Sequence, residues 1–487
     1  MGQGSRRSDR VPVSDPERGL DHVHGDAAGS PAGRRSIGDA FAPRANSLNF
    51  LRLMMAVAVV FSHGIILGAF GSEYVLGHTT IGNVAVMGFF VISGFLIAGS
   101  AGRNGLGRYL WQRFLRIMPG FWVCLVVTAA VFGLVGWLVK GDPRGPQCGL
   151  DCYVTGPAGA VDYVTHNFFL WMGQYQIAGG PRGVPYPLAW DGSLWTLYYE
   201  FLCYLALGAL AFVGVLRHRT LLLVVATAVW LTEAAVAVRL VSPGLNVDES
   251  SLLRLAPAFL VGAVVYVYRD RIPDSGWIAL VCTAGFVSGL WWVAGGGSIN
   301  GATVLAPLLA YPMLWLGIHL PFRSIGSRND YSYGVYIYAF PVQQLLAIWG
   351  LQRWGYVPFV LLTLVGTAPF AVASWWLVER QALRHKGYTP SVLAPNPVKV
   401  PGLWRTSPLV KWVAYQLSPH PGVHSATRRH AHSRVRPHHR LGHPSLMADR
   451  ARAAGAAGPV TLRRYPPEPV GAGAGGRGPS GSSTAVG

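Results

Sequence analysis

Apolar stretches long enough to cross a lipid bilayer recur along most of this chain of 487 residues. A helix needs about 20 consecutive apolar residues to cross the hydrocarbon core. Ten stretches reach or approach that length, at about 48–70, 79–100, 119–139, 194–215, 220–240, 252–268, 277–295, 302–319, 332–351 and 356–378. Charged residues make up only 13% of the chain, about half the share in a typical soluble domain, which excludes a wholly soluble enzyme and a disordered chain. We therefore predict an all-α integral membrane protein, a polytopic bundle of about ten transmembrane helices.

The two ends of the chain differ from this membrane domain in composition. Residues 1–45 are polar and contain no apolar segment typical of a cleavable signal peptide, so we interpret them as a disordered leader. Residues 388–487 carry 13 basic residues against two acidic ones, and we interpret them as a basic, disordered tail attracted to anionic lipid. The membrane domain is thus predicted at residues 46–387.

The distribution of basic residues between the loops predicts the orientation. With the N-terminus inside, ten arginines between residues 103 and 328 fall in inside loops, whereas the outside loops hold only Lys140, Arg144, Arg182 and Arg353. This asymmetry follows the positive-inside rule. We predict a multi-pass protein of the cytoplasmic membrane with both termini cytoplasmic. The 140–193 loop would then face outside, where a disulfide between Cys148 and Cys152 is chemically possible.

A histidine and an arginine lie within the first apolar stretch, where ionisable side chains are costly and usually functional. Arg52 and His63 are eleven positions apart. At 3.6 residues per turn this is about 20° beyond three full turns, with a rise of roughly 16 Å, so both side chains lie on one face. Arg52 is expected at the cytoplasmic edge and His63 beyond the midplane. The alternatives are a snorkelling arginine and a packed histidine bonded to a neighbouring helix.

A carboxylate is predicted at a depth similar to that of the histidine. Glu200 lies about two turns below the outer edge of its span, in the sequence Ser-Leu-Trp-Thr-Leu-Tyr-Tyr-Glu. A carboxylate beside an imidazole fixes its tautomer and stabilises the imidazolium, so His63 and Glu200 are candidates for a base and its orienting group. Glu233, in the next span, is a rival partner.

Two arginines before the third span share one face if the segment is helical. Arg113 and Arg116 are three residues apart, and their guanidinium groups would suit a phosphate-rich ligand on the cytoplasmic side. Ordinary topology-determining charge is the alternative. In the second span, Ser93 and Gly94 are small residues that commonly just allow close helix packing. The tyrosines of segment 331–341 indicate either core lining or, with Pro341, a kink that opens a cavity.

Together these residues resemble acyltransferase family 3, a family of membrane-bound O-acyltransferases. The resemblance covers about residues 46–387. It rests on five motifs in order: Arg-x10-His at 52 and 63, Phe-Phe-x-x-Ser-Gly-Phe-Leu at 89–96, Arg-Phe-Leu-Arg-Ile-Met-Pro at 113–119, Ser-Leu-Trp-Thr-Leu-x-x-Glu at 193–200, and Tyr-Gly-x-Tyr…Pro at 333–341.

The resemblance implies an acyl-CoA donor, usually acetyl-CoA, taken from the cytoplasm. It also implies an acceptor hydroxyl on a sugar of a surface polysaccharide, glycolipid or glycosylated metabolite, with membrane lipids as surroundings and neither nucleic acid nor metal as partner. In that family the histidine matching His63 is essential, and the Arg-x-x-Arg pair is required. We predict that His63 acts as general base with Glu200 as its orienting group. The donor is predicted to be bound by Arg52, Arg113, Arg116 and Ser93.

One position departs from the family pattern. Many members carry a histidine two residues before the proline of the late tyrosine motif, and here that position is Ala339. A mechanism that needs a second histidine at this point is therefore not expected for this chain.

Two other classes of function fit a polytopic chain with buried ionisable groups. A glycan transporter or flippase without acyl transfer would also carry a buried histidine and glutamate, but it would need neither a CoA-phosphate site nor the five ordered motifs. A non-catalytic, acyltransferase-like scaffold would tolerate loss of His63 or of the arginine pair, and neither is lost. Release of free CoA from acetyl-CoA distinguishes the enzyme from the transporter.

Overall fold

The structure is a computed structural model that describes residues 35–73, 79–237, 247–295 and 301–388. Most of the predicted leader and nearly all of the predicted tail lie outside these residues. Within the described ranges the chain is helical and forms no β-strand. The first half holds α1 (Ile37–Ala40), α2 (Leu48–Leu67), α3 (Ile81–Ala101), α4 (Leu106–Val127), η1 (Thr128–Gly133), α5 (Leu134–Lys140), α6 (Leu150–Thr155), α7 (Ala160–His166) and α8 (Trp195–Phe212). The second half holds η2 (Val215–Arg217), α9 (Arg219–Ala237), α10 (Val247–Tyr268), α11 (Gly276–Gly295), η3 (Gly301–Leu305), α12 (Ala306–His319), α13 (Ser332–Ile348), η4 (Leu351–Trp354), α14 (Tyr356–Ala373), η5 (Ser374–Glu379), α15 (Arg380–Arg384) and η6 (His385–Gly387).

Each of the ten predicted stretches coincides with a helix. By length and composition, seven helical segments are long and apolar enough to cross a membrane: Leu48–Leu67, Ile81–Ala101, Leu106–Lys140, Trp195–Phe212, Arg219–Ala237, Ser251–Tyr268 and Tyr356–Gly387. The stretches predicted at 277–295, 302–319 and 332–351 correspond to helices outside that set. The all-helical membrane architecture is therefore confirmed, whereas the count of ten spans and the cytoplasmic placement of both termini stay predictions.

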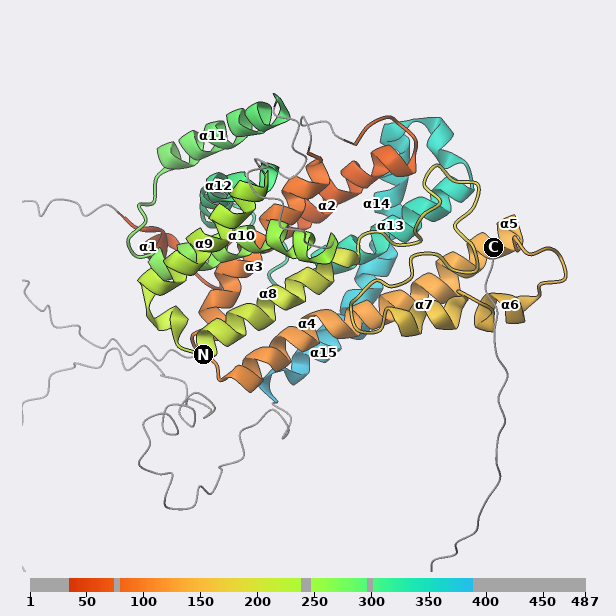
Figure 1. Cartoon of the computed structure of the whole chain (residues 1–487), viewed down its shortest axis with the longest axis horizontal. Helices are drawn as coiled ribbons and strands as arrows, with labels where there is room; N and C mark the ends of the chain where they lie inside the picture. The colour runs from red at the N-terminus through yellow and green to blue at the C-terminus, as the bar shows by residue number, and fades with distance from the viewer. Residues whose placement is uncertain (1–34, 74–78, 238–246, 296–300, 389–487) are drawn as a thin grey trace, which may run out of the picture. The chain divides into compact units, whose positions relative to one another are not determined.

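The outward faces of these helices are apolar. Val224 on α9 is 62% exposed, and Val365 on α14 is 71% exposed. Trp291 on α11, which lies along one side of the bundle, is 78% exposed (Figure 1). Soluble proteins rarely present large contiguous apolar surfaces to water. These side chains instead suit contact with lipid.

The closest helix contact in the bundle joins α3 and α10. A Cβ atom added at Gly94 of α3 would lie 1.9 Å from the carbonyl oxygen of Phe259, and one added at Gly262 of α10 would lie 2.1 Å from that of Val91. The two backbones therefore touch, and no side chain fits between them. For Gly94, the packing interpretation of the small residues in the second span is correct.

Replacing Gly94 by alanine is expected to destabilise the protein by at least about 1–3 kcal/mol, the usual cost of overpacking, because the added methyl meets backbone and not a movable side chain. Thermal unfolding in lipid nanodiscs measures this change. Gly285→Ala on α11 is the matched control, since the nearest atom to its added Cβ is 3.5 Å away. Equal melting temperatures for Gly94→Ala and the native chain would contradict the packing.

The segment between α5 and α8 is a folded, partly buried loop. Cys148 and Cys152, between which the sequence made a disulfide chemically possible, form one in the structure, with Cα atoms 5.4 Å apart. Asn167 organises the middle of the loop, because its amide donates to the carbonyl of Gln174 and accepts from the backbone N–H groups of Gly173 and Gln174. Close to α8 the chain turns inward, and Asp191 is fully buried. Helix α8 therefore begins inside the protein.

Candidate active site

Two of the predicted site arginines meet on one carboxylate that the sequence analysis missed. Asp330 lies just before α13, and its Oδ2 accepts from Nη1 of Arg52 at 3.0 Å and from Nη2 of Arg116 at 2.6 Å. A second carboxylate, Glu379 of η5, lies 3.5 Å from Nη1 of Arg116. Burial raises the pKa of Asp330, but the charges of Arg116 and Arg52 outweigh it and lower the pKa to about 2. Asp330 is thus an anion at neutral pH, and it ties α2 to α4.

The two arginines of the Arg-x-x-Arg motif have different surroundings. Whereas Arg116 faces two carboxylates, the guanidinium of Arg113 lies over the ring of Tyr204, with its carbon 5.9 Å from the ring centroid. The buried Nε of Arg113 has no hydrogen-bond partner among the described residues. Within that part of the chain no carboxylate forms an ion pair with Arg113, and Glu200 acts on its charge only at longer range.

Ser93 and Glu200 are brought together by the fold. The hydroxyl of Ser93 donates to Oε1 of Glu200 at 2.8 Å, and the hydroxyl of Tyr204 donates to the same oxygen. A small cavity of about 30 Å³ lies beside them and is also lined by Arg52. Tyr333 and Tyr336 of the late tyrosine motif line it too. Five of the six predicted site residues therefore belong to one charged region: Arg52, Arg116, Ser93 and Glu200, together with Arg113, which lies over the ring of Tyr204.

His63 lies near the far end of α2 from this charged region. Its ring packs edge-on against Phe340 of α13, with centroids 5.2 Å apart. The side chain is half-buried, and neither ring nitrogen is hydrogen-bonded to any residue that the structure describes. The alternative of a packed histidine bonded to a neighbouring helix predicts such a bond, and the described residues supply none.

The expected pairing of His63 with Glu200 is wrong. Glu200 instead bonds Ser93 and Tyr204, and it shares a cavity with Arg52, which lies three helical turns below His63. The reason is the inward-turning loop before α8. Because the first turn of α8 is already inside the protein, Glu200 in the second turn reaches the level of Arg52. The rival, Glu233, accepts from Thr303 at 2.6 Å and does not bond His63 either.

The surroundings of His63 contain polar groups that sequence reasoning missed. Ser62 donates to Glu73 at 2.6 Å and accepts from the N–H of Gly82 at 2.9 Å, so it ties the loop after α2 to the start of α3. Burial raises the pKa of Glu73, against the lowering effect of the Ser62 hydroxyl. The fully buried amide of Gln343 donates to the carbonyl of Val60 at 3.0 Å, one turn before His63. In the sequence, the indication of this contact was the adjacent pair Gln343 and Gln344, which are polar residues in an apolar span.

The second of those glutamines holds the loop before α8. Nε2 of Gln344 donates to the carbonyls of Tyr186 at 2.8 Å and Ala189 at 2.7 Å. Ala339, where many relatives carry a histidine, packs with Val60 of α2. Helix α13 therefore contacts the helix that carries His63 on one side and the loop on the other.

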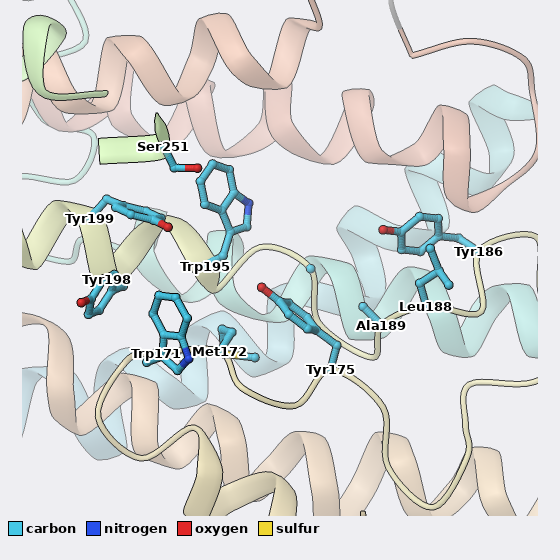
Figure 2. Close-up of a pocket in the computed structure, with 11 residues that line it drawn as sticks. Trp171, Met172, Tyr175, Tyr186, Leu188, Ala189, Trp195, Tyr198, Tyr199 and Ser251 are labelled. Atoms are coloured by element: carbon cyan, nitrogen blue, oxygen red, sulfur yellow. The ribbon is translucent and has the colours of Figure 1, made fainter. Parts of the chain in front are cut away.

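A larger cavity, of about 550 Å³, lies between this loop and α8 (Figure 2). Its volume is in the ~300–1,000 Å³ range of small-molecule sites. Six aromatic side chains line it: Trp171, Tyr175, Tyr186, Trp195, Tyr198 and Tyr199. No charged residue lines it among the described ranges. Sequence analysis did not find this cavity, because its walls come from a loop with no helical periodicity.

In the described ranges, no group of three or more His, Cys, Asp or Glu side chains is placed to hold a metal ion. The charged region consists of arginines, carboxylates and hydroxyl groups. This donor set suits anion recognition by guanidinium groups.

Comparison with known proteins gives consistent results. Residues 45–377 match acyltransferase family 3, described as an acyltransferase domain. The chain is 27% identical over 351 residues to an O-acetyl transferase of Shigella phage Sf6, covering 70% of this chain and 96% of the phage protein. It is 28% identical over 365 residues to nodulation protein 10 of Rhizobium leguminosarum bv. viciae, covering 70% of this chain and 93% of that protein. No solved structure matches it significantly. With its five motifs on a helical membrane bundle and a family match over most of its length, the chain belongs to acyltransferase family 3 and is an acyltransferase.

Proposed function

We propose that this acyltransferase transfers an acetyl group from cytoplasmic acetyl-CoA to a sugar hydroxyl of a surface polysaccharide, glycolipid or glycosylated metabolite, and that it works in the cytoplasmic membrane. The name of the phage relative, an O-acetyl transferase, supports acetyl as the group transferred. The charged region at one end of α2 and the imidazole towards its other end support a donor and an acceptor that approach from opposite sides.

His63 is the proposed general base. A sugar hydroxyl is a poor nucleophile at neutral pH, and a neutral imidazole removes its proton as the oxygen attacks the thioester carbonyl. The new C–O ester bond forms, the C–S bond breaks, and CoA leaves as a thiolate. The proton held on His63 then passes to the thiolate or to water, which restores the neutral base. The half-buried ring without a hydrogen-bond partner among the described residues suits this role.

The charged region is the proposed donor site. Arg113 carries the charge best placed to bind a CoA phosphate, because no carboxylate of the described residues forms an ion pair with its guanidinium and Glu200 acts on it only at longer range. Arg52 and Arg116 provide further positive potential while Asp330 fixes their positions. Ser93 and Glu200 line the path, and Glu200 acts as a positioning residue for Ser93 and Tyr204, not for His63.

One observation supports this proposal above the others. Helix α2 carries both Arg52, which is anchored in the charged region, and His63, about 16 Å further along the same helix. A donor whose phosphates are bound near Arg52 would have to extend a flexible arm along α2 to bring its thioester to the imidazole. Acyl-CoA has this construction, with the anionic nucleotide at one end and the thioester at the other.

The experiment that tests the function uses the full chain in liposomes with acetyl-CoA on one side and a glycan mixture on the other. Release of free CoA is measured with a thiol reagent, and mass spectrometry detects acetylated glycan. We expect CoA release that depends on the glycan and equals the acetyl groups gained. Movement of unmodified glycan across the membrane without CoA release would contradict acyl transfer and favour the transporter.

Replacing Arg113 by alanine is expected to raise KM for acetyl-CoA by about tenfold to a hundredfold, with a smaller change in kcat. A charge-assisted hydrogen bond to a phosphate contributes roughly 1.5–3 kcal/mol, and this binding is made equally before and during the reaction. Steady-state kinetics with varied acetyl-CoA measure the shift.

Donor truncation provides the control for this variant. S-acetylpantetheine lacks the phosphoadenosine part of CoA, so the native chain and Arg113→Ala should use it equally well. Arg323→Ala, at an exposed loop position, should leave KM for acetyl-CoA unchanged. A KM effect of Arg113→Ala that persists with the truncated donor would contradict phosphate binding.

A further inference from the structure

The first two turns of α8 separate the two cavities of the site. Trp195, Tyr198 and Tyr199 line the larger one, at positions i, i+3 and i+4, which share one helix face. Thr196 and Glu200 line the smaller one and lie on a different face, centred about 130° around the helix. The same helix thus has a charged cavity on one side and an uncharged, aromatic cavity on the other.

The chemistry of the larger cavity selects against the donor. CoA carries several phosphate charges, which need cations, and among the residues that the structure describes no Arg, Lys or His lines this cavity. Its walls are indole and phenol rings, and in Figure 2 the hydroxyl groups of Tyr175 and Tyr186 point towards the cavity between them and Trp195. A pyranose ring matches these walls, because its C–H faces stack on aromatic rings while its hydroxyl groups exchange hydrogen bonds with phenols.

The cavity has an accessible rim and a closed floor. Trp171 is 40% exposed and Leu188 is 62% exposed, whereas Ala189 and Tyr199 are only 4% and 5% exposed. A ligand entering past Trp171 would therefore reach a dry interior. Ring stacking contributes most in such water-excluded surroundings.

The floor of the cavity adjoins the ring that packs on His63. A Cβ atom added at Gly192, which lines the cavity, would lie 2.7 Å from Phe340. Tyr186, on the same wall, has its ring centroid 6.1 Å from that of Phe340. Since Phe340 packs directly on His63, one aromatic ring separates the cavity from the imidazole.

We propose that this aromatic cavity is the acceptor subsite, that it binds an uncharged pyranose ring, and that Trp171 is the stacking platform at its entrance. The proposal rests on the proposed acyl transfer for the meaning of the bound sugar, but binding itself can be measured without catalysis. It assigns donor and acceptor to different faces of α8 and places the acceptor sugar beside Phe340, with this one ring between the cavity and His63.

The test measures binding of methyl glucopyranoside to the full chain in lipid nanodiscs, because glycosidic detergents would present the same rings. Saturable quenching of tryptophan fluorescence is expected in the absence of acetyl-CoA. Trp171→Ala should weaken binding about tenfold or more, and Trp171→Phe, which keeps a smaller ring, should weaken it less. The uronic acid counterpart of the same glycoside should bind at least about tenfold more weakly than the neutral sugar, because the described lining of the cavity contains no cation.

Two matched variants make the test specific. Phe169→Ala removes an aromatic ring from the same loop, 78% exposed and outside the cavity, and Trp277→Ala removes an exposed tryptophan of α11. Both should bind the glycoside like the native chain. Unchanged binding in Trp171→Ala, equal weakening in Phe169→Ala, or tighter binding of the uronic acid would overturn the proposal.

Kinetics separate this proposal from the proposed function. Trp171→Ala should raise KM for the glycan acceptor while KM for acetyl-CoA stays within about twofold of the native value. If acyl transfer survives loss of His63 while glycoside binding still depends on Trp171, the proposed mechanism fails and the acceptor subsite stands. If transfer requires His63 while glycoside binding does not depend on Trp171, the acceptor subsite is contradicted and the proposed mechanism stands.

Discussion

Acyl transfer is expected to fall by about 10²–10⁴-fold in kcat when His63 is replaced by alanine, the usual contribution of a positioned general base. The loss should appear in kcat more than in KM for acetyl-CoA, because the donor phosphates are proposed to bind three turns away, near Arg52. CoA release and mass spectrometry of the glycan measure both parameters. The variant should remain inserted and folded, since the structure describes no hydrogen bond that depends on the imidazole.

His218→Ala is the matched control for this variant, because His218 is exposed between α8 and α9. It should keep native activity and native melting temperature. Unchanged glycan acetylation in His63→Ala would remove His63 from the chemistry. A melting temperature that falls together with activity would instead indicate that the ring supports packing against Phe340.

Asp330→Asn is expected to give the second large effect, a loss of about 3 kcal/mol of stability with a matching loss of donor binding. The change removes the carboxylate that Arg52 and Arg116 share and leaves two largely buried guanidinium groups with one counter-charge, Glu379. Breaking a buried ion pair from one side typically costs about 3–5 kcal/mol. Thermal unfolding in nanodiscs and KM for acetyl-CoA measure the two consequences.

Because Asp330 is stabilising only as an anion, we expect the stability of the protein to fall at acidic pH, which gives the stability profile an acid limb. The pKa of Asp330 is lowered to about 2 in the folded protein, so its contribution is fully present above the unfolded pKa near 4 and is lost as the pH falls through about 2. Asp330→Asn should therefore lose less stability than the native chain between about pH 4 and pH 2. Asp270→Asn, which removes an exposed partner of Arg269, is the control and should change neither property. A native acid limb in Asp330→Asn would contradict this assignment.

Much of the fold could be predicted from apolar periodicity alone. The ten predicted stretches all proved helical, because a long apolar run in lipid must satisfy its own backbone hydrogen bonds. The family resemblance, drawn from motifs between residues 52 and 341, was confirmed by the match over residues 45–377. Arg52 and His63 on one face of α2 also follow from helical geometry, which acts within a single element.

Contacts between distant segments could not be predicted in this way. His63 and Glu200 would lie at the same depth only if α8 started at the membrane surface. The chain before α8 is buried instead, and Glu200 bonds Ser93. Asp330 gave no signal, because a carboxylate in a loop resembles any surface charge until Arg52 and Arg116 converge on it. The aromatic cavity was missed for a similar reason, since its rings come from an irregular loop and one helix face.

The sequence by itself determined that this chain is a helical membrane acyltransferase, and it predicted the histidine and arginines that we propose for the reaction, since hydrophobicity and helical spacing act along the chain. Only the tertiary structure decided how these groups are arranged: Arg116 pairs with Asp330 and Glu379, Arg113 lies over the ring of Tyr204, Glu200 shares a cavity with Arg52, and Phe340 packs on His63. These relations depend on where helices far apart in the chain begin and how closely their backbones approach, as at Gly94 and Gly262. No local pattern carries that information.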